Sequence, residues 1–116
     1  MLLRSVDERL ELGVRRYGHG VRVNDDTTTW GTPSNSWIDM AREELLDAVI
    51  YIIADYIRLK GISSNGPDDN ELIRSIANNW STIDSPEHRL LLWNLTRMLD
   101  NKLFHNVVSG DDSVDT

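Results

Sequence analysis

"WIDMAREELLDAVIYIIADYIRLK", residues 37–60, is among the most apolar stretches of the chain, yet carboxylates interrupt it at regular intervals. Positions three, four and seven apart share one face of a helix, so this spacing predicts a helix. Its apolar side chains form two adjacent lines, which are Leu45–Val49–Ile52–Tyr56 and Leu46–Ile50–Ile53–Ile57. A helix that is apolar around most of its circumference must be enclosed. Because four short helices can hardly surround it, we expect a homodimer or homotetramer.

A third line on the same helix carries polar and charged side chains, namely Glu44, Asp47, Tyr51, Asp55 and Arg58. A carboxylate between apolar neighbours is costly unless it is paired, hydrogen-bonded or bound to a metal. Arginines from other helices could neutralise these acids, or the line could simply face solvent. Alternatively, the i,i+3 spacing of Glu44 and Asp47 directs both carboxylates to one place, as oxygen ligands of Mg²⁺ or Mn²⁺ require.

The composition limits both the architecture and the classes of partner. A chain of 116 residues suits one domain, expected over residues 1–105 and followed by an acidic, flexible tail over 106–116. The formal net charge of −7 argues against nucleic acid polymers and anionic membranes as partners. The absence of cysteine excludes disulfides, thiol catalysis and cysteine-ligated zinc. No secretory leader or membrane-length apolar run is recognisable, so we expect a soluble, cytoplasmic protein.

Three other segments have helical patterns, and none shows convincing strand alternation. We expect helices over residues 3–17, 69–80 and 85–104 in addition to the long one, giving an all-α, four-helix bundle-like domain. Ser36 is a plausible N-cap of the long helix, and Gly61 marks its end. The polar loop between the first two helices is long for a compact domain, which is typical of segments that bind or cover something.

The first helix repeats the acidic pattern in "DERLELG", where Glu8 and Glu11 are three residues apart and Arg15 follows one turn later. If this helix packs face to face with the long one, the two acid pairs would build a cage of four carboxylates. The alternative is an exposed Glu11–Arg15 pair that merely supports its own helix.

These residues resemble a known family. "EELLDAVIYIIADYIR" is similar to the carboxylate-rich helix of MazG-like, all-α nucleoside triphosphate pyrophosphohydrolases, and the wider "DERLELGVRRYGHGVRVNDDTTTWGTPSNSWIDMAREELLDAVIY" resembles small phage-encoded members. The resemblance covers roughly the first half of the chain. It implies an oligomeric helical bundle that holds Mg²⁺ or Mn²⁺ and cleaves the α–β bond of (d)NTPs, releasing a monophosphate and pyrophosphate. One phage branch of the family cleaves dGTP to dGMP.

The family carries EExxE on one helix and ExxD on the next, and the match can be made in two registers. In the first, Glu44 and Asp47 match ExxD, while Asp7, Glu8 and Glu11 approximate EExxE, although an Asp begins that motif and the intervening segment is longer than usual. In the second, the first motif is Glu43–Glu44–Asp47 itself, and the second acid pair is either degenerate or contributed by Asp55.

The resemblance and the residue chemistry together suggest roles. Glu43, Glu44 and Asp47 are the catalytic candidates, with Glu43 the candidate to orient or deprotonate the attacking water. The candidate metal ligands are Glu44, Asp47, Glu11, Glu8 and Asp55. The candidates for clamping phosphate are Arg15, Arg58 and Lys60, which could equally be solvated charges. The candidates for base binding are Trp30, Asn24, Tyr51 and Trp37, although tryptophans are commonly core or interface anchors.

Two rival interpretations come from other classes of protein. A non-catalytic protein that sequesters a nucleotide would keep the bundle and the basic residues. However, acids converging in a pocket would repel its anionic ligand. A structural helical adaptor would leave the acids paired with arginines and form no cleft. The surroundings of Glu44 and Asp47 therefore discriminate between the three interpretations.

Overall fold

The structure is a computed structural model that describes residues 2–107, with side chains described through Phe104. Five α-helices and two short 3-10 helices make up this part of the chain, which contains no β-strand: α1 (Leu2–Tyr17), η1 (Thr27–Trp30), α2 (Trp37–Lys60), α3 (Asn70–Asn78), η2 (Trp80–Thr82), α4 (Pro86–Leu99) and α5 (Lys102–Val107). The predicted all-α class is therefore confirmed. The expected tail begins within α5, and residues 108–116 lie outside the described part.

Both predicted ends of α2 are confirmed by their capping contacts. The Ser36 hydroxyl accepts a hydrogen bond from the backbone N–H of Asp39 at 3.2 Å, which satisfies one of the free donors of the first turn. At the other end, Gly61 adopts a left-handed conformation with φ of 68°, and its N–H bonds to the carbonyls of Ile57 and Arg58. Glycine is favoured at this position because a Cβ atom would strain it.

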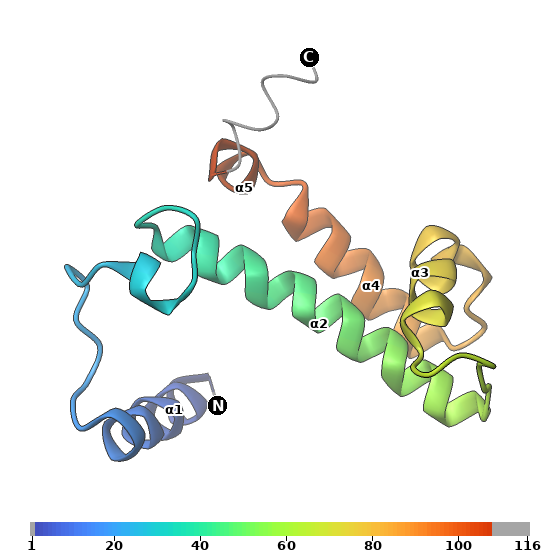
Figure 1. Cartoon of the computed structure of the whole chain (residues 1–116), viewed down its shortest axis with the longest axis horizontal. Helices are drawn as coiled ribbons and strands as arrows, with labels where there is room; N and C mark the ends of the chain where they lie inside the picture. The colour runs from blue at the N-terminus through green and yellow to red at the C-terminus, as the bar shows by residue number, and fades with distance from the viewer. Residues whose placement is uncertain (1, 108–116) are drawn as a thin grey trace.

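The core lies between α2 and α4 and is closed by α3 and η2. Figure 1 shows α4 running alongside α2, with α3 near the C-terminal end of α2. Ile53 and Ile57 of α2 pack with Leu92 of α4 and with Ile83, which directly follows η2. The buried α2 members of this core are Ile53, Tyr56 and Ile57, whereas Leu46 and Ile50 remain 38% and 45% exposed.

The prediction of one continuous helix over residues 85–104 is wrong, because the helix is interrupted after Leu99. The structure ends α4 there and begins α5 at Lys102. Asn101 explains the restart, since its side-chain oxygen accepts a hydrogen bond from the Leu103 N–H at 2.8 Å. A side chain that caps a new helix in this way competes with continuation of the previous one. The start of this helix agrees with the predicted bound, because Ser85 caps α4 ahead of Pro86.

Helix α1 stands apart from the rest, which corrects the expectation of a four-helix bundle that includes it. Figure 1 shows it set apart from the α2–α4 pair and joined to η1 by an extended segment. No α1 residue is buried, and the side chains of its apolar face are exposed: Leu3, Val6, Leu10 and Val14. The radius of gyration is 17.1 Å, whereas a compact domain of this length has about 13 Å.

None of the helices in the described part of the chain is both long and apolar enough to cross a membrane.

Candidate functional site

Among the residues that the structure describes, the acids in the N-terminal half of α2 have no ion-pair partner. Glu43 and Glu44 are exposed and Asp47 is half-buried. The described residues form three ion pairs, which are Lys60–Asp84, Arg74–Glu71 and His88–Asp55, and none involves these acids. Within the described part of a single copy, no arginine therefore neutralises Glu44 or Asp47. About one helical turn separates Glu44 and Asp47 along α2, and the residues therefore share one face of the helix.

The acids of α1 do not meet those of α2 within one chain. Glu8, Glu11 and Arg15 are exposed on α1, where they line a shallow hollow of that helix alone. Within residues 2–107 no group of three or more His, Cys, Asp or Glu side chains lies close enough to hold a metal ion. The predicted cage of four carboxylates is therefore not assembled by a single copy.

Asp55 lies farther along α2 and is engaged by His88 of α4. The His88 Nε2 atom lies 2.7 Å from Asp55 Oδ2, and the Nδ1 atom of the same ring lies 2.5 Å from Ser85 Oγ. Asp55 follows Asp47 by eight residues, which is about 12 Å along a helix. The structure thus separates Asp55 from the other metal-ligand candidates.

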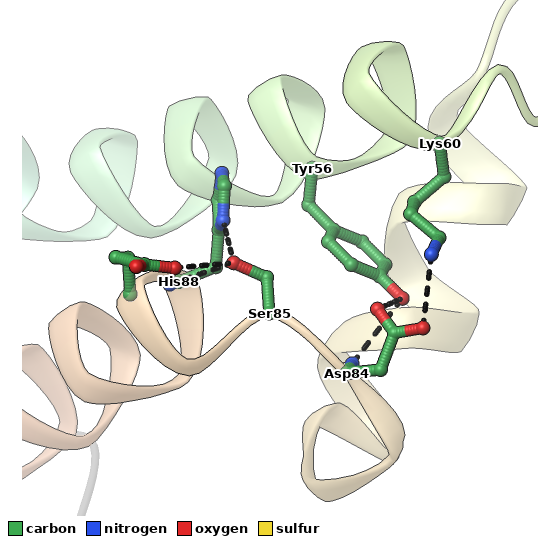
Figure 2. A network of polar contacts seen from close by, with 6 residues as sticks. Tyr56, Lys60, Asp84, Ser85 and His88 are labelled. Carbon is green, nitrogen blue, oxygen red and sulfur yellow. Dashed lines mark hydrogen bonds and ion pairs between the residues drawn. The ribbon is translucent and has the colours of Figure 1, made fainter.

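The Ser85–His88–Asp55 series has the residue types of a hydrolase relay, which sequence reasoning missed. Its contacts favour a structural role. Ser85 Oγ also caps α4 by accepting the backbone N–H of His88 at 3.3 Å. The His88 ring is largely buried and contacts the Tyr56 ring edge-on, with centroids 5.7 Å apart. Figure 2 shows this network at the point where α4 begins beside α2, and we assign it to joining the two helices.

The phosphate-binding candidates of α2 lie at its far end. Arg58 and Lys60 follow Glu44 by 14 and 16 residues, which is about 21 and 24 Å along the helix. The Lys60 ammonium donates to Asp84 Oδ2 at 2.9 Å, and the Tyr56 hydroxyl donates to Asp84 Oδ1 at 3.2 Å (Figure 2). Neither cation lies near Glu44 within one chain.

The Lys60–Asp84 contact should make stability depend on pH. The hydrogen bond from Lys60 holds the pKa of Asp84 below its ordinary value, so the contact stabilises the fold above that value and is lost as the pH falls through the lowered pKa. We expect Asp84→Asn to reduce the free energy of unfolding at about pH 7 but to change it little at about pH 2. The same contact raises the pKa of Lys60, which titrates far above this range.

Urea unfolding of both proteins at the two pH values measures this difference. The amide keeps an oxygen that can accept from Tyr56, so the comparison isolates the carboxylate charge. An Asp84→Asn effect that is equal at both pH values would contradict the prediction. Because both groups are largely exposed, the effect is expected to be small.

The loop before α2 is held together by a cluster of hydrogen bonds around Thr27, which is fully buried. The Thr27 hydroxyl lies 2.8 Å from the Thr32 hydroxyl and accepts the Ser36 N–H at 2.7 Å. The Thr27 N–H donates to the side-chain oxygen of Asn35 at 2.9 Å, and Ser34 donates to Asp39 Oδ2 at 2.7 Å. These contacts connect η1 directly to the first turn of α2.

The loop cluster positions two tryptophans beside a cavity of about 400 Å³. Trp30 ends η1 and Trp37 begins α2, and their ring centroids lie 5.4 Å apart with the planes tilted by 49°. The Trp37 indole N–H donates to the Val23 carbonyl at 2.9 Å, which fixes its orientation. Met40 of α2 and the C-terminal half of α1 complete the walls.

Of the base-binding candidates, Trp30 and Trp37 line this cavity, whereas Tyr51 and Asn24 do not. Tyr51 is exposed on α2 one turn beyond Asp47, and Asn24 is exposed in the loop. Sequence reasoning missed the contributions of Tyr17 at the end of α1 and of two arginines, Arg9 and Arg22. The sequence offered one signal for this lining, because aromatic and basic residues flank the "GHG" turn.

Comparisons with protein-family models, with curated proteins and with solved structures give no match for this chain.

Proposed function

We propose that this protein is a metal-dependent (d)NTP pyrophosphohydrolase, which cleaves the α–β phosphate bond to give a (d)NMP and pyrophosphate. The observation that supports this proposal most is the state of Glu44 and Asp47. They lie one turn apart on a largely apolar helix, and neither has an ion-pair partner in the described part of the chain. Two unpaired carboxylates at this spacing repel each other and are therefore favourable ligands for a divalent cation.

The donor set fits Mg²⁺ or Mn²⁺. Magnesium in proteins is commonly held by one or two carboxylates, while water molecules and substrate phosphates complete its coordination. Glu44 and Asp47 supply such a pair of oxygen donors. A bound cation would neutralise phosphate charge and lower the pKa of a coordinated water.

The protein's own side chains would then act on the substrate and on water. Glu44 and Asp47 would hold the triphosphate through the shared cation, which offsets the net charge of −7. Glu43, exposed beside them, would accept the proton of the attacking water. The water oxygen forms a bond to the α-phosphorus as the bond from that phosphorus to the α–β bridging oxygen breaks. Pyrophosphate leaves with the electron pair of the broken bond.

We also propose that the active form is a homodimer or homotetramer. Apolar side chains of α1 and of α2 are exposed in the single copy, Leu10, Leu46 and Ile50 among them. A second copy could cover these faces and bring Glu8 and Glu11 of one α1 toward Glu44 and Asp47 of the other chain. Light scattering on the eluting peak of a size-exclusion column measures the mass, and a monomer at every concentration would contradict this assembly.

The proposal is tested by incubating the protein with each (d)NTP and Mg²⁺ or Mn²⁺ and assaying pyrophosphate. The resemblance of "EELLDAVIYIIADYIR" to the pyrophosphohydrolase helix makes dGTP the first substrate to test. Release that requires the divalent cation supports the proposal. Nucleotide binding without any release would instead indicate the sequestering protein, and no pyrophosphate with any substrate and either metal would refute the enzyme.

A further inference from the structure

We infer that the cavity between α1, η1 and the start of α2 is a nucleotide subsite, in which a base stacks on Trp30 and the attached phosphate is held by Arg9 and Arg22. This inference deepens the proposed function and rests on it for the identity of the ligand. Its basis in the structure is independent of the carboxylates, because it depends on the aromatic rings, the charges and the position of the cavity.

The walls of the cavity offer aromatic surface of the kind that bases stack on. Tyr17, Trp30 and Trp37 all contribute to it, and all three rings are exposed. Exposed tryptophans are costly unless something covers them, and the volume of about 400 Å³ lies within the ~300–1,000 Å³ typical of small-molecule sites. The two indole planes are tilted by 49°, so the rings do not stack face to face on each other.

The charge around the cavity suits an anion. Arg9, Arg22 and His19 contribute to its lining, and no Asp or Glu does. This is notable in a chain that has 19 acidic and 12 basic residues. Arginine binds phosphate oxygens through two parallel N–H donors, and its planar group also stacks on aromatic rings. A planar ring that carries a phosphate satisfies both the aromatic and the cationic parts of the lining.

The position of the cavity on α2 connects it to the carboxylates. Met40 lines the cavity, Glu44 follows it by one helical turn, and Asp47 follows Glu44 by another. The three side chains therefore lie in sequence along one face of α2. A nucleotide whose base occupies the cavity can extend its phosphates along this face toward the acids.

The two tryptophan walls of the cavity are held in place by hydrogen bonds within the chain. Trp37 is oriented by its hydrogen bond to the Val23 carbonyl, and Trp30 is carried by η1, which the contacts of Thr27 attach to the start of α2. A preorganised wall loses little conformational entropy on binding, which increases affinity.

Isothermal titration of the full chain with the four deoxynucleoside monophosphates, in EDTA, tests this subsite without catalysis. We expect one or more of these nucleotides to bind, and each to bind more tightly than its nucleoside or inorganic phosphate. Trp30→Ala should weaken nucleotide binding by roughly 5- to 150-fold, the range that base–aromatic stacking implies. Trp30→Phe, which keeps a ring to stack on, should recover most of the loss.

Trp93→Ala is the matched control, because Trp93 is about as exposed as Trp30 and has an arginine nearby, with Arg97 at 5.8 Å from its ring centroid, but lies on α4. It should leave nucleotide affinity unchanged. Arg22→Gln should weaken the nucleotide and spare the nucleoside. The subsite is refuted if no monophosphate binds, if Trp30→Ala binds as tightly as the unmodified chain, or if inorganic phosphate binds as tightly as the nucleotides.

The same titration separates this inference from the proposed function. Glu44→Gln lies outside the cavity, so it should bind the monophosphate in EDTA at least as tightly as the unmodified chain. Binding that depends on Trp30 in a protein that releases no pyrophosphate would uphold the subsite and refute the enzyme. Metal-dependent release that is insensitive to Trp30→Ala, in both KM and kcat, would uphold the enzyme and refute the subsite.

Discussion

Replacing Glu44 with Gln is expected to lower the rate of pyrophosphate release by about 10²- to 10³-fold, because charge stabilisation by a held cation is worth several kcal/mol in the transition state. The substitution keeps the size of the side chain but removes the negative oxygen that the cation prefers. Asp47 would remain as a single carboxylate, which is a weak site for Mg²⁺. The measurement is the initial rate with saturating metal and substrate, compared with the unmodified chain.

Two controls accompany Glu44→Gln, namely the rate of a variant at a distant acid and the melting temperature of Glu44→Gln itself. Glu71→Gln removes an exposed glutamate of α3 that is paired with Arg74, and it should retain the unmodified rate. Glu44→Gln should not lower the melting temperature, since it relieves repulsion between Glu44 and Asp47. In the unmodified chain Mg²⁺ should raise the melting temperature, and Glu44→Gln should diminish that rise. Unchanged release by Glu44→Gln would exclude this carboxylate from the reaction.

Replacing Ile53 with Ala is expected to reduce the free energy of unfolding by about 2–5 kcal/mol. Ile53 is only 1% exposed and lies at the centre of the contact between α2 and α4. The smaller side chain leaves a cavity that its neighbours can fill only in part. Because the total stability of a domain is about 5–15 kcal/mol, this one substitution removes a large share of it. Urea unfolding followed by far-ultraviolet circular dichroism gives the difference.

Ile50→Ala is the matched control for Ile53→Ala, because it makes the same change three residues earlier on the same helix. Ile50 is 45% exposed, and substitutions at exposed positions usually change stability by about 0.5 kcal/mol or less. If copies associate through this face, the cost of Ile50→Ala should grow with protein concentration. Equal costs for the two variants in dilute solution would contradict the position of the core described here.

The bounds of α2 could be predicted from the sequence because local contacts determine them. Ser36 and Gly61 act through their own neighbours in the chain, and both behave as their residue types suggest. The restart at Asn101 was equally local, and an Asn capping the residue two positions later is a known alternative to helix continuation. The apolar run through Leu99 and Leu103 obscured it.

Long-range contacts were beyond the reach of periodicity. His88 and Asp55 are 33 residues apart, and Lys60 and Asp84 are 24 apart, so nothing in either segment specifies the pairing. The position of α1 was mispredicted for a related reason. The amphipathic pattern of α1 shows that one face of this helix is apolar and favours burial. The pattern does not specify which surface of the protein covers that face.

The site was predicted in part for the same physical reasons. The i,i+3 spacing shows that Glu44 and Asp47 share one face of α2, because a helix of known period fixes that relation. It does not show what surrounds them: the pattern predicted a strip between buried flanks, whereas Glu44 is exposed and Asp47 is half-buried in the single copy. The cavity walls come from three separate segments, so Tyr17, Trp30 and Met40 could not be grouped from spacing. Trp30 was found because an aromatic residue in a long polar loop is unusual.

The hydrogen bonds that Thr27 itself makes join uncharged groups, which has a practical consequence for ionic strength. The bonds around Thr27 join hydroxyl, amide and carbonyl groups, whereas salt chiefly screens interactions between charges, over about 10 Å at 0.1 M. The tryptophan walls should therefore keep their arrangement in concentrated salt while attraction between arginine and phosphate declines. Raising the concentration of potassium chloride should therefore weaken the contacts between arginine and phosphate while the stacking of the base stays in place.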